Sequence, residues 1–150
     1  MKILVVEDDY VQSQWILMNL KKTFGSQPQW IETESQFRDN VKKIAANPPD
    51  VVIMDVMLSW TEASENMTPR PPEVRQEGMY RAGLRCQEIL SNLDETKNVP
   101  VILYTVQNLQ DLERDLKDMP PNVLFLPKEA NIDPLIERID ELVAKSSDIT

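Results

Sequence analysis

The chain has 150 residues, of which 41% are hydrophobic and 27% charged, which is ordinary for one soluble domain with its own core. Its formal net charge of −9 disfavours phosphate backbones, so we expect no direct binding to nucleic acid. The chain has no histidine, which excludes His-based sites, and its single cysteine excludes an internal disulfide. It has no signal-peptide pattern and no apolar run of transmembrane length, so we expect a cytoplasmic protein without membrane insertion.

Apolar runs alternate with helical patterns from the first residues. Ile3–Val6 is wholly apolar and β-branched at three positions, which is typical of a strand buried on both faces. After it, Val11, Trp15 and Met18 recur at helical spacing, and this pattern predicts a helix that ends near Gly25.

A weak strand at residues 29–32 is expected at a sheet edge. Thr33 and Gln36 form a capping-box pattern, which predicts the start of a second helix. Its apolar face would contain Phe37, Val41, Ile44 and Ala45, and Asn47-Pro48-Pro49 would end it. Val51–Met54 is the next buried strand.

The second half of the chain continues the alternation. Residues 59–80 are expected to be an irregular insertion that becomes helical near Met79, and the helix that follows contains Ala82, Cys86, Ile89, Leu90 and Leu93. A strand at 101–104 precedes a helix with Leu109, Leu112, Leu116 and Met119. A strand at 123–126 precedes the last helix, which Asp133 would cap with Pro134 at its first position.

Five strands alternating with five helices predict an α/β fold with a parallel sheet covered on both faces. The flavodoxin-like doubly wound (βα)5 sheet, with strand order 2-1-3-4-5, is the common five-stranded solution. We therefore predict one domain over residues 1–150, with the insertion at about 59–80 between strand 3 and helix 3.

Polar side chains follow four of these strands where each strand ends. Glu7 and Asp8 follow the first, Asp55 the third, Thr105 the fourth and Lys128 the fifth. In such a sheet ligands bind beyond the carboxyl ends of the strands, where the strand order reverses. Clustered carboxylates suit Mg²⁺, while a hydroxyl and a lysine complement phosphoryl oxygens. The pattern predicts a Mg²⁺-dependent site in which a carboxylate accepts a phosphoryl group.

The segments at residues 3–9, 51–55, 101–105 and 126–128 resemble the signature segments of response-regulator receiver domains of two-component signalling. The resemblance covers nearly the whole chain apart from the insertion. It implies that Asp55 is the phosphoacceptor and that Asp8 binds Mg²⁺ directly. It also implies that Glu7 acts through water or as a second ligand, and that Met57 offers its backbone carbonyl to the metal.

The resemblance gives the remaining polar residues roles as well. Thr105 would hydrogen-bond the phosphoryl oxygen, and Lys128 would pair with it. Phe125 matches the aromatic switch position that turns inward when the hydroxyl moves, and it is also an ordinary core residue of a strand.

As a receiver, the protein would take its phosphoryl group from a histidine kinase or a histidine phosphotransfer domain. It would catalyse its own phosphorylation and dephosphorylation without being a dedicated turnover enzyme. We expect output by contact with a downstream protein target, with a phosphorylation-dependent homodimer as a further form of output.

Four features depart from the receiver pattern. Ser59 and Glu129 stand where receivers usually have proline, and Val106 stands where they have a small residue. The insertion adds about twenty residues and would act as a lid, as a docking surface, or as a solvated excursion with no role.

These departures leave an alternative open, in which the chain is a phosphorylation-independent adaptor that acts by protein binding. A hydrolase of the haloacid-dehalogenase type is disfavoured because Met57 stands where that class needs a second aspartate. A nucleotide-binding protein is disfavoured because three glycines leave no phosphate-binding loop.

Overall fold

The computed structural model describes residues 1–61 and 69–148, and its centre is a five-stranded parallel sheet. The strands lie in the order β2-β1-β3-β4-β5, so the predicted flavodoxin-like order is confirmed. Strand β2 lies at one edge, as expected, and β1 is paired to both β2 and β3. The strand bounds are β1 Ile3–Val6, β2 Gln29–Ile31, β3 Val51–Met54, β4 Val101–Thr105 and β5 Val123–Pro127.

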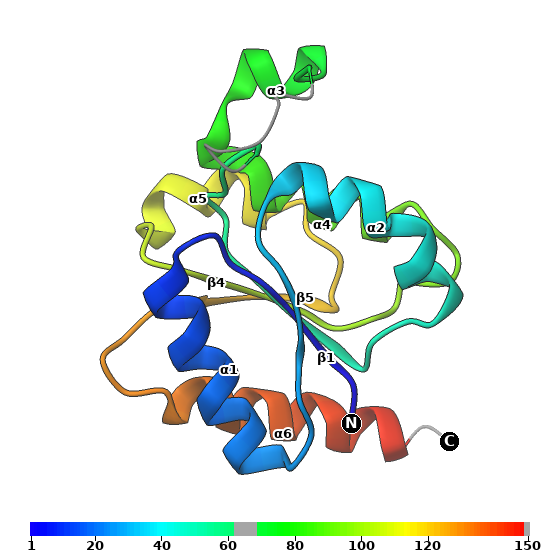
Figure 1. The fold of residues 1–150 in the computed structure, drawn as a ribbon, viewed down its shortest axis with the longest axis vertical. Coiled ribbons are helices and arrows are strands. Elements are labelled where there is room, and N and C mark those ends of the chain that lie inside the picture. The colour runs from blue at the N-terminus through cyan, green and yellow to red at the C-terminus, as the bar shows by residue number, and fades with distance from the viewer. Residues whose placement is uncertain (62–68, 149–150) are drawn as a thin grey trace.

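Helices cover both faces of the sheet (Figure 1). Leu4 and Val6 belong to the core beneath α2 (Glu34–Ala46), α4 (Ala82–Ser91) and α5 (Leu109–Leu116). Ile3 and Val5 point the other way, into the core beneath α1 (Tyr10–Phe24) and α6 (Asp133–Asp148). This alternation follows from the two-residue repeat of a strand, and it explains why the central strands are apolar throughout. No helix in the described ranges is both long and apolar enough to cross a membrane.

The ends of α1 and α2 follow the predicted capping signals. The Asp9 carboxylate accepts a hydrogen bond from the Gln12 amide at the start of α1, and the Thr33 hydroxyl accepts one from the Gln36 amide at the start of α2. Gly25 ends α1 with a φ of 80°, a left-handed conformation that glycine adopts readily.

The apolar pattern that predicted α1 does not mark its buried face. Val11 and Met18 are exposed, with 76% and 63% of their surface accessible. The side of α1 that packs on the sheet lies one or two positions along the chain from the predicted stripe. Its buried residues are Ser13, Ile16, Leu17 and Leu20.

The insertion contains more regular structure than the sequence predicted. Its described part includes helix α3 (Pro72–Glu77) and a 3₁₀ turn, η1 (Met79–Arg81), so the expectation of an irregular stretch is wrong there. Proline at the first position of α3 favours a helix start, because its fixed φ is helical and its missing N–H is not needed. Residues 62–68 of the predicted insertion lie outside the described residues.

A network of ion pairs joins the insertion to the body of the domain. Glu34 and Arg85, which are nearly inaccessible to solvent, form a two-pronged pair with N–O distances of 2.6 and 2.9 Å. Arg85 also contacts Glu77 of α3 at 3.5 Å, and Arg38 of α2 contacts Glu73 at 3.0 Å. Helix α3 therefore lies outside the layer of α2, α4 and α5 but is tied to it (Figure 1).

Gly83 permits the close approach of α4 to the loop after β3. Its amide donates to the Val56 carbonyl at 2.8 Å. A Cβ atom at this position would lie 2.0 Å from the Asp55 carbonyl oxygen and 2.7 Å from the Val56 Cα. Since both neighbours are backbone atoms, neither can give way without moving the loop that carries Asp55.

We predict that Gly83→Ala lowers the free energy of unfolding by about 3 kcal/mol or more, because this overpacking cannot relax. The matched control is Gly25→Ala, whose Cβ would meet no atom within 4 Å, so that its cost is the left-handed conformation, about 1–2 kcal/mol. Urea denaturation of both variants provides the comparison. Equal losses in the two variants would contradict a steric role for Gly83.

Candidate functional site

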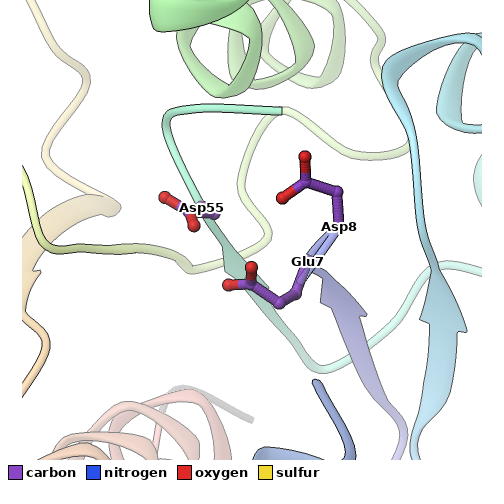
Figure 2. Close-up of side chains that lie close together, drawn as sticks. All are labelled: Glu7, Asp8 and Asp55. Carbon is purple, nitrogen blue, oxygen red and sulfur yellow. The ribbon is translucent and has the colours of Figure 1, made fainter. Parts of the chain in front are cut away.

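Three carboxylates gather at the carboxyl ends of β1 and β3 (Figure 2). Glu7 and Asp8 leave the end of β1, and Asp55 leaves the end of β3. One carboxylate oxygen from each lies within 4.8 Å of the others. Glu7 and Asp55 are only 2% and 7% accessible, while Asp8 is half-buried. The parallel pairing of β1 with β3 accounts for this convergence, because it brings both strand ends to one edge.

Lys128 bridges two of the three carboxylates. Its Nζ lies 2.5 Å from Glu7 Oε2 and 2.9 Å from Asp55 Oδ2. Its backbone amide donates to the Thr105 carbonyl at 2.9 Å, which fixes the residue after the end of β5. The ammonium also lies 5.9 Å from the centre of the Tyr104 ring, a cation–π distance that the sequence gave no reason to expect.

Burial and charge together perturb the ionisation of this cluster. Burial, followed by the nearby charge of Asp55, raises the pKa of Glu7 to about 8 even though Lys128 acts in the opposite direction. Burial alone would lower the pKa of Lys128, but the charges of Asp55 and Glu7 outweigh it and the pKa is raised. Glu7 and Asp55 thus share the Lys128 ammonium, and Asp8 lies beside this pair.

Asp8 is held by a different partner. Both the backbone amide and the hydroxyl of Ser59 donate to Asp8 Oδ2, each at 2.9 Å. The sequence marked Ser59 only as a departure from a family pattern and gave no sign of this contact. Trp30 is a second contact that the sequence did not predict, since its indole N–H donates to the Glu7 backbone carbonyl at 2.9 Å.

Thr105 and Met57 also lie beside the cluster. The Thr105 side chain is buried, and its hydroxyl accepts a hydrogen bond from the Gln107 amide at 3.2 Å. The Met57 amide donates to Asp55 Oδ1 at 3.3 Å, so the loop after β3 folds back over the aspartate. All the sequence-predicted residues that would contact metal or phosphate therefore lie at this edge of the sheet.

The remaining predicted positions lie around the edge. Phe125 is half-buried on β5 and packs against the core beneath α2, α4 and α5. Val106 is 65% accessible, so its side chain points largely into solvent. The described residues contain no cis peptide bond, and the bond from Lys128 to Glu129 is trans.

The donor set suits a hard divalent cation. Oxygen ligands from closely spaced carboxylates are what Mg²⁺ and Ca²⁺ prefer, and Mg²⁺ typically keeps waters beside one or two of them. The negative charge left over after pairing with Lys128 favours a cation at this position. The acidic cluster can therefore hold a metal ion.

Comparisons with known proteins identify the fold. No protein-family model matches the chain, and no curated protein matches it. The solved receiver domain of a signal transduction histidine kinase from Syntrophus aciditrophicus is 21% identical, with a TM-score of 0.67 over 96% of this chain and 90% of that chain. The receiver domain of a Francisella response regulator is 20% identical, with a TM-score of 0.67 over 97% and 98%.

The chain has the receiver-domain fold. A third structure with this fold is the receiver domain of a sensor histidine kinase from Pseudomonas aeruginosa, which is 18% identical with a TM-score of 0.65 over 95% of this chain and 97% of that chain. That structure contains a magnesium ion coordinated in its active-site cleft. The resemblance drawn from short sequence segments is thus confirmed at the level of the fold.

The elevated pKa of Glu7 predicts how stability depends on pH. A carboxyl whose pKa is higher in the folded state stabilises the fold fully below its unfolded value of about 4.5, and this contribution is lost as the pH rises towards 8. Glu7→Gln removes the titration. In EDTA, we expect the stability of the variant relative to wild type to increase between pH 5 and pH 8, by up to roughly 1.4 kcal/mol per pH unit.

Urea denaturation at pH 5, 6, 7 and 8 measures this difference. Groups far from residue 7 are the same in both proteins, so their contributions cancel in the comparison. Parallel stability curves for wild type and Glu7→Gln would show that Glu7 has an ordinary pKa in the folded protein.

Proposed function

We propose that the protein is a phosphoacceptor receiver of a two-component or phosphorelay system, in which Asp55 accepts a phosphoryl group. The observation that carries this proposal is the contact of Lys128 with both Asp55 and Glu7, inside an acidic cluster at the carboxyl edge of a receiver fold. An ion pair made only for stability would not need two further carboxylates beside it, because these repel one another.

Glu7, Asp8 and Asp55 would hold Mg²⁺, with the Met57 carbonyl as a further ligand. When bound, Mg²⁺ supplies positive charge that offsets the carboxylates and the phosphoryl oxygens. A receiver domain of similar fold holds magnesium in its cleft, which supports this assignment for the acidic cluster.

The chain's own residues have separate tasks in the transfer. An Asp55 oxygen attacks phosphorus, and the bond from phosphorus to the donor atom breaks, so the donor leaves with that electron pair. Lys128 then exchanges its contact with Asp55 Oδ2 for one with a phosphoryl oxygen. Thr105, whose hydroxyl accepts a backbone amide bond from Gln107, donates a hydrogen bond to a second phosphoryl oxygen.

The phosphoryl donor would be a histidine kinase or a histidine phosphotransfer domain, and the signal would pass to a downstream protein. Thr105 and Phe125 lie on neighbouring strands, and the register pairs Phe125 with Leu103, two residues before Thr105. Movement of Thr105 towards the phosphoryl group would bias the packing of Phe125 between two arrangements. The protein would catalyse these transfers on itself, and it is not proposed as a turnover enzyme.

Incubation with acetyl phosphate and Mg²⁺, followed by intact-mass measurement, tests the proposed acceptor. We expect a single phosphoryl adduct on wild type, with none on Asp55→Asn and none when EDTA is present. Asp50→Asn is the matched control, because Asp50 lies at the opposite end of β3 and is expected to leave the adduct intact.

Failure of wild type to form the adduct, together with failure to bind beryllofluoride in the presence of Mg²⁺, would reject the phosphoacceptor role. The phosphorylation-independent adaptor would then be the better account of the chain.

The lifetime of the phosphorylated form depends on the side chain of Met57. Its backbone amide lies next to Asp55, so an apolar side chain there disfavours water at the phosphoryl group. Met57→Asn adds a hydrogen-bonding group worth about 1 kcal/mol, which would shorten the half-life about fivefold. Decay of the adduct is followed by intact mass after removal of acetyl phosphate, with Met57→Leu as the apolar control. An unchanged or longer half-life in Met57→Asn contradicts this role.

A further inference from the structure

Asp8 differs from the other two carboxylates in how it is held. Glu7 and Asp55 are buried and paired with Lys128. Asp8 is half-buried, and within the described residues the hydrogen bonds to its carboxylate come from Ser59 alone. Without Ser59, a half-exposed aspartate would be free to adopt several rotamers, and only some of them face the cluster.

The two bonds from Ser59 have a specific geometry. The amide and the hydroxyl both donate to Oδ2, which leaves Oδ1 available to a cation. A proline at this position, which the family pattern favours, would supply neither donor, because it has no N–H and no hydroxyl. The departure at position 59 therefore creates a contact that the common residue cannot make.

Ser59 is itself fixed by the start of α2. The Glu34 amide donates to the Ser59 carbonyl at 3.0 Å, and the Ser35 amide donates to the Trp60 carbonyl at 2.9 Å. Glu34 is fully buried and paired with Arg85, so this end of α2 is anchored in the body of the domain. The donors to Asp8 thus stand on a rigid support, which is what precise placement of a metal ligand requires.

We propose that Ser59 is a positioning residue that orients Asp8 for Mg²⁺, an inference that rests on the metal site of the proposed function. Groups that hydrogen-bond a ligating carboxylate fix its orientation, and their loss typically weakens metal affinity about 10- to 100-fold. Ser59 contacts neither the metal nor the phosphoryl group in this account, and it acts through Asp8.

Calorimetric titration of the phosphate-free protein with Mg²⁺ alone tests the proposal. Ser59→Ala keeps the hydrogen bond from the backbone amide to Asp8 and removes the one from the hydroxyl. We expect this variant to bind Mg²⁺ about tenfold more weakly. Ser59→Thr keeps a hydroxyl and should restore most of the affinity. Ser26→Ala is the matched control, because it also removes a hydroxyl that donates a hydrogen bond, in this case to the Met1 carbonyl. Ser26 follows the C-terminal end of α1, whereas Asp9 and the site lie at the N-terminal end.

Urea denaturation in EDTA shows whether each variant is folded. If Ser59→Ala does not fold, Ser59→Cys keeps the size of the side chain with a weaker donor, and it too should lose affinity. A folded Ser59→Ala or Ser59→Cys protein that binds Mg²⁺ as tightly as wild type overturns the positioning role and leaves the phosphoacceptor role intact. Absence of Mg²⁺ binding in wild type overturns both, and the acetyl phosphate experiment would then fail as well.

Discussion

Two buried carboxylates share one ammonium at the carboxyl edge of the sheet, and a third carboxylate lies beside them. The arrangement of this edge depends on that imbalance of charge. Lys128 pairs with both Glu7 and Asp55, and all three side chains are largely buried. The remaining negative charge is only partly relieved by the higher pKa of Glu7. A site with this excess gains free energy from any added positive charge, so binding of a cation and stability of the fold are linked.

The fold holds these charges together through its backbone. Asp55 follows β3 with its amide bonded to the Val6 carbonyl, and Lys128 follows β5 with its amide bonded to the Thr105 carbonyl. Gly83, which has no Cβ atom, lets the start of α4 pack directly against the backbone carbonyl of Asp55. Asp55 and Lys128 are thus each placed by a hydrogen bond from their own backbone amide to a neighbouring strand. The packing of the strands opposes the electrostatic repulsion within the cluster.

The sequence predicted the sheet order, the edge that carries the site and the residues that meet there, because buried parallel strands leave a strong apolar signal and each was followed by a polar residue. The sequence did not predict which side of α1 is buried, and it did not predict helix α3. Helix α1 is apolar on two sides, so Val11 and Met18 suggested a face that is in fact exposed. Helix α3 is short and rich in charge, and its position depends on ion pairs to Arg38 and Arg85 that no local pattern encodes.

The long insertion and Ser59, which stands where receivers usually have proline, both belong to the loop after β3. A long surface loop adds little closure cost once its ends are fixed, since that cost grows only slowly with length. Here the first end is fixed close to the site, where Ser59 and Trp60 are bonded to the start of α2. The second end is fixed where the Leu58 amide meets the Met79 carbonyl at 3.2 Å. The two ends of the insertion are therefore held close together, and the loop after β3 keeps its place beside Asp8.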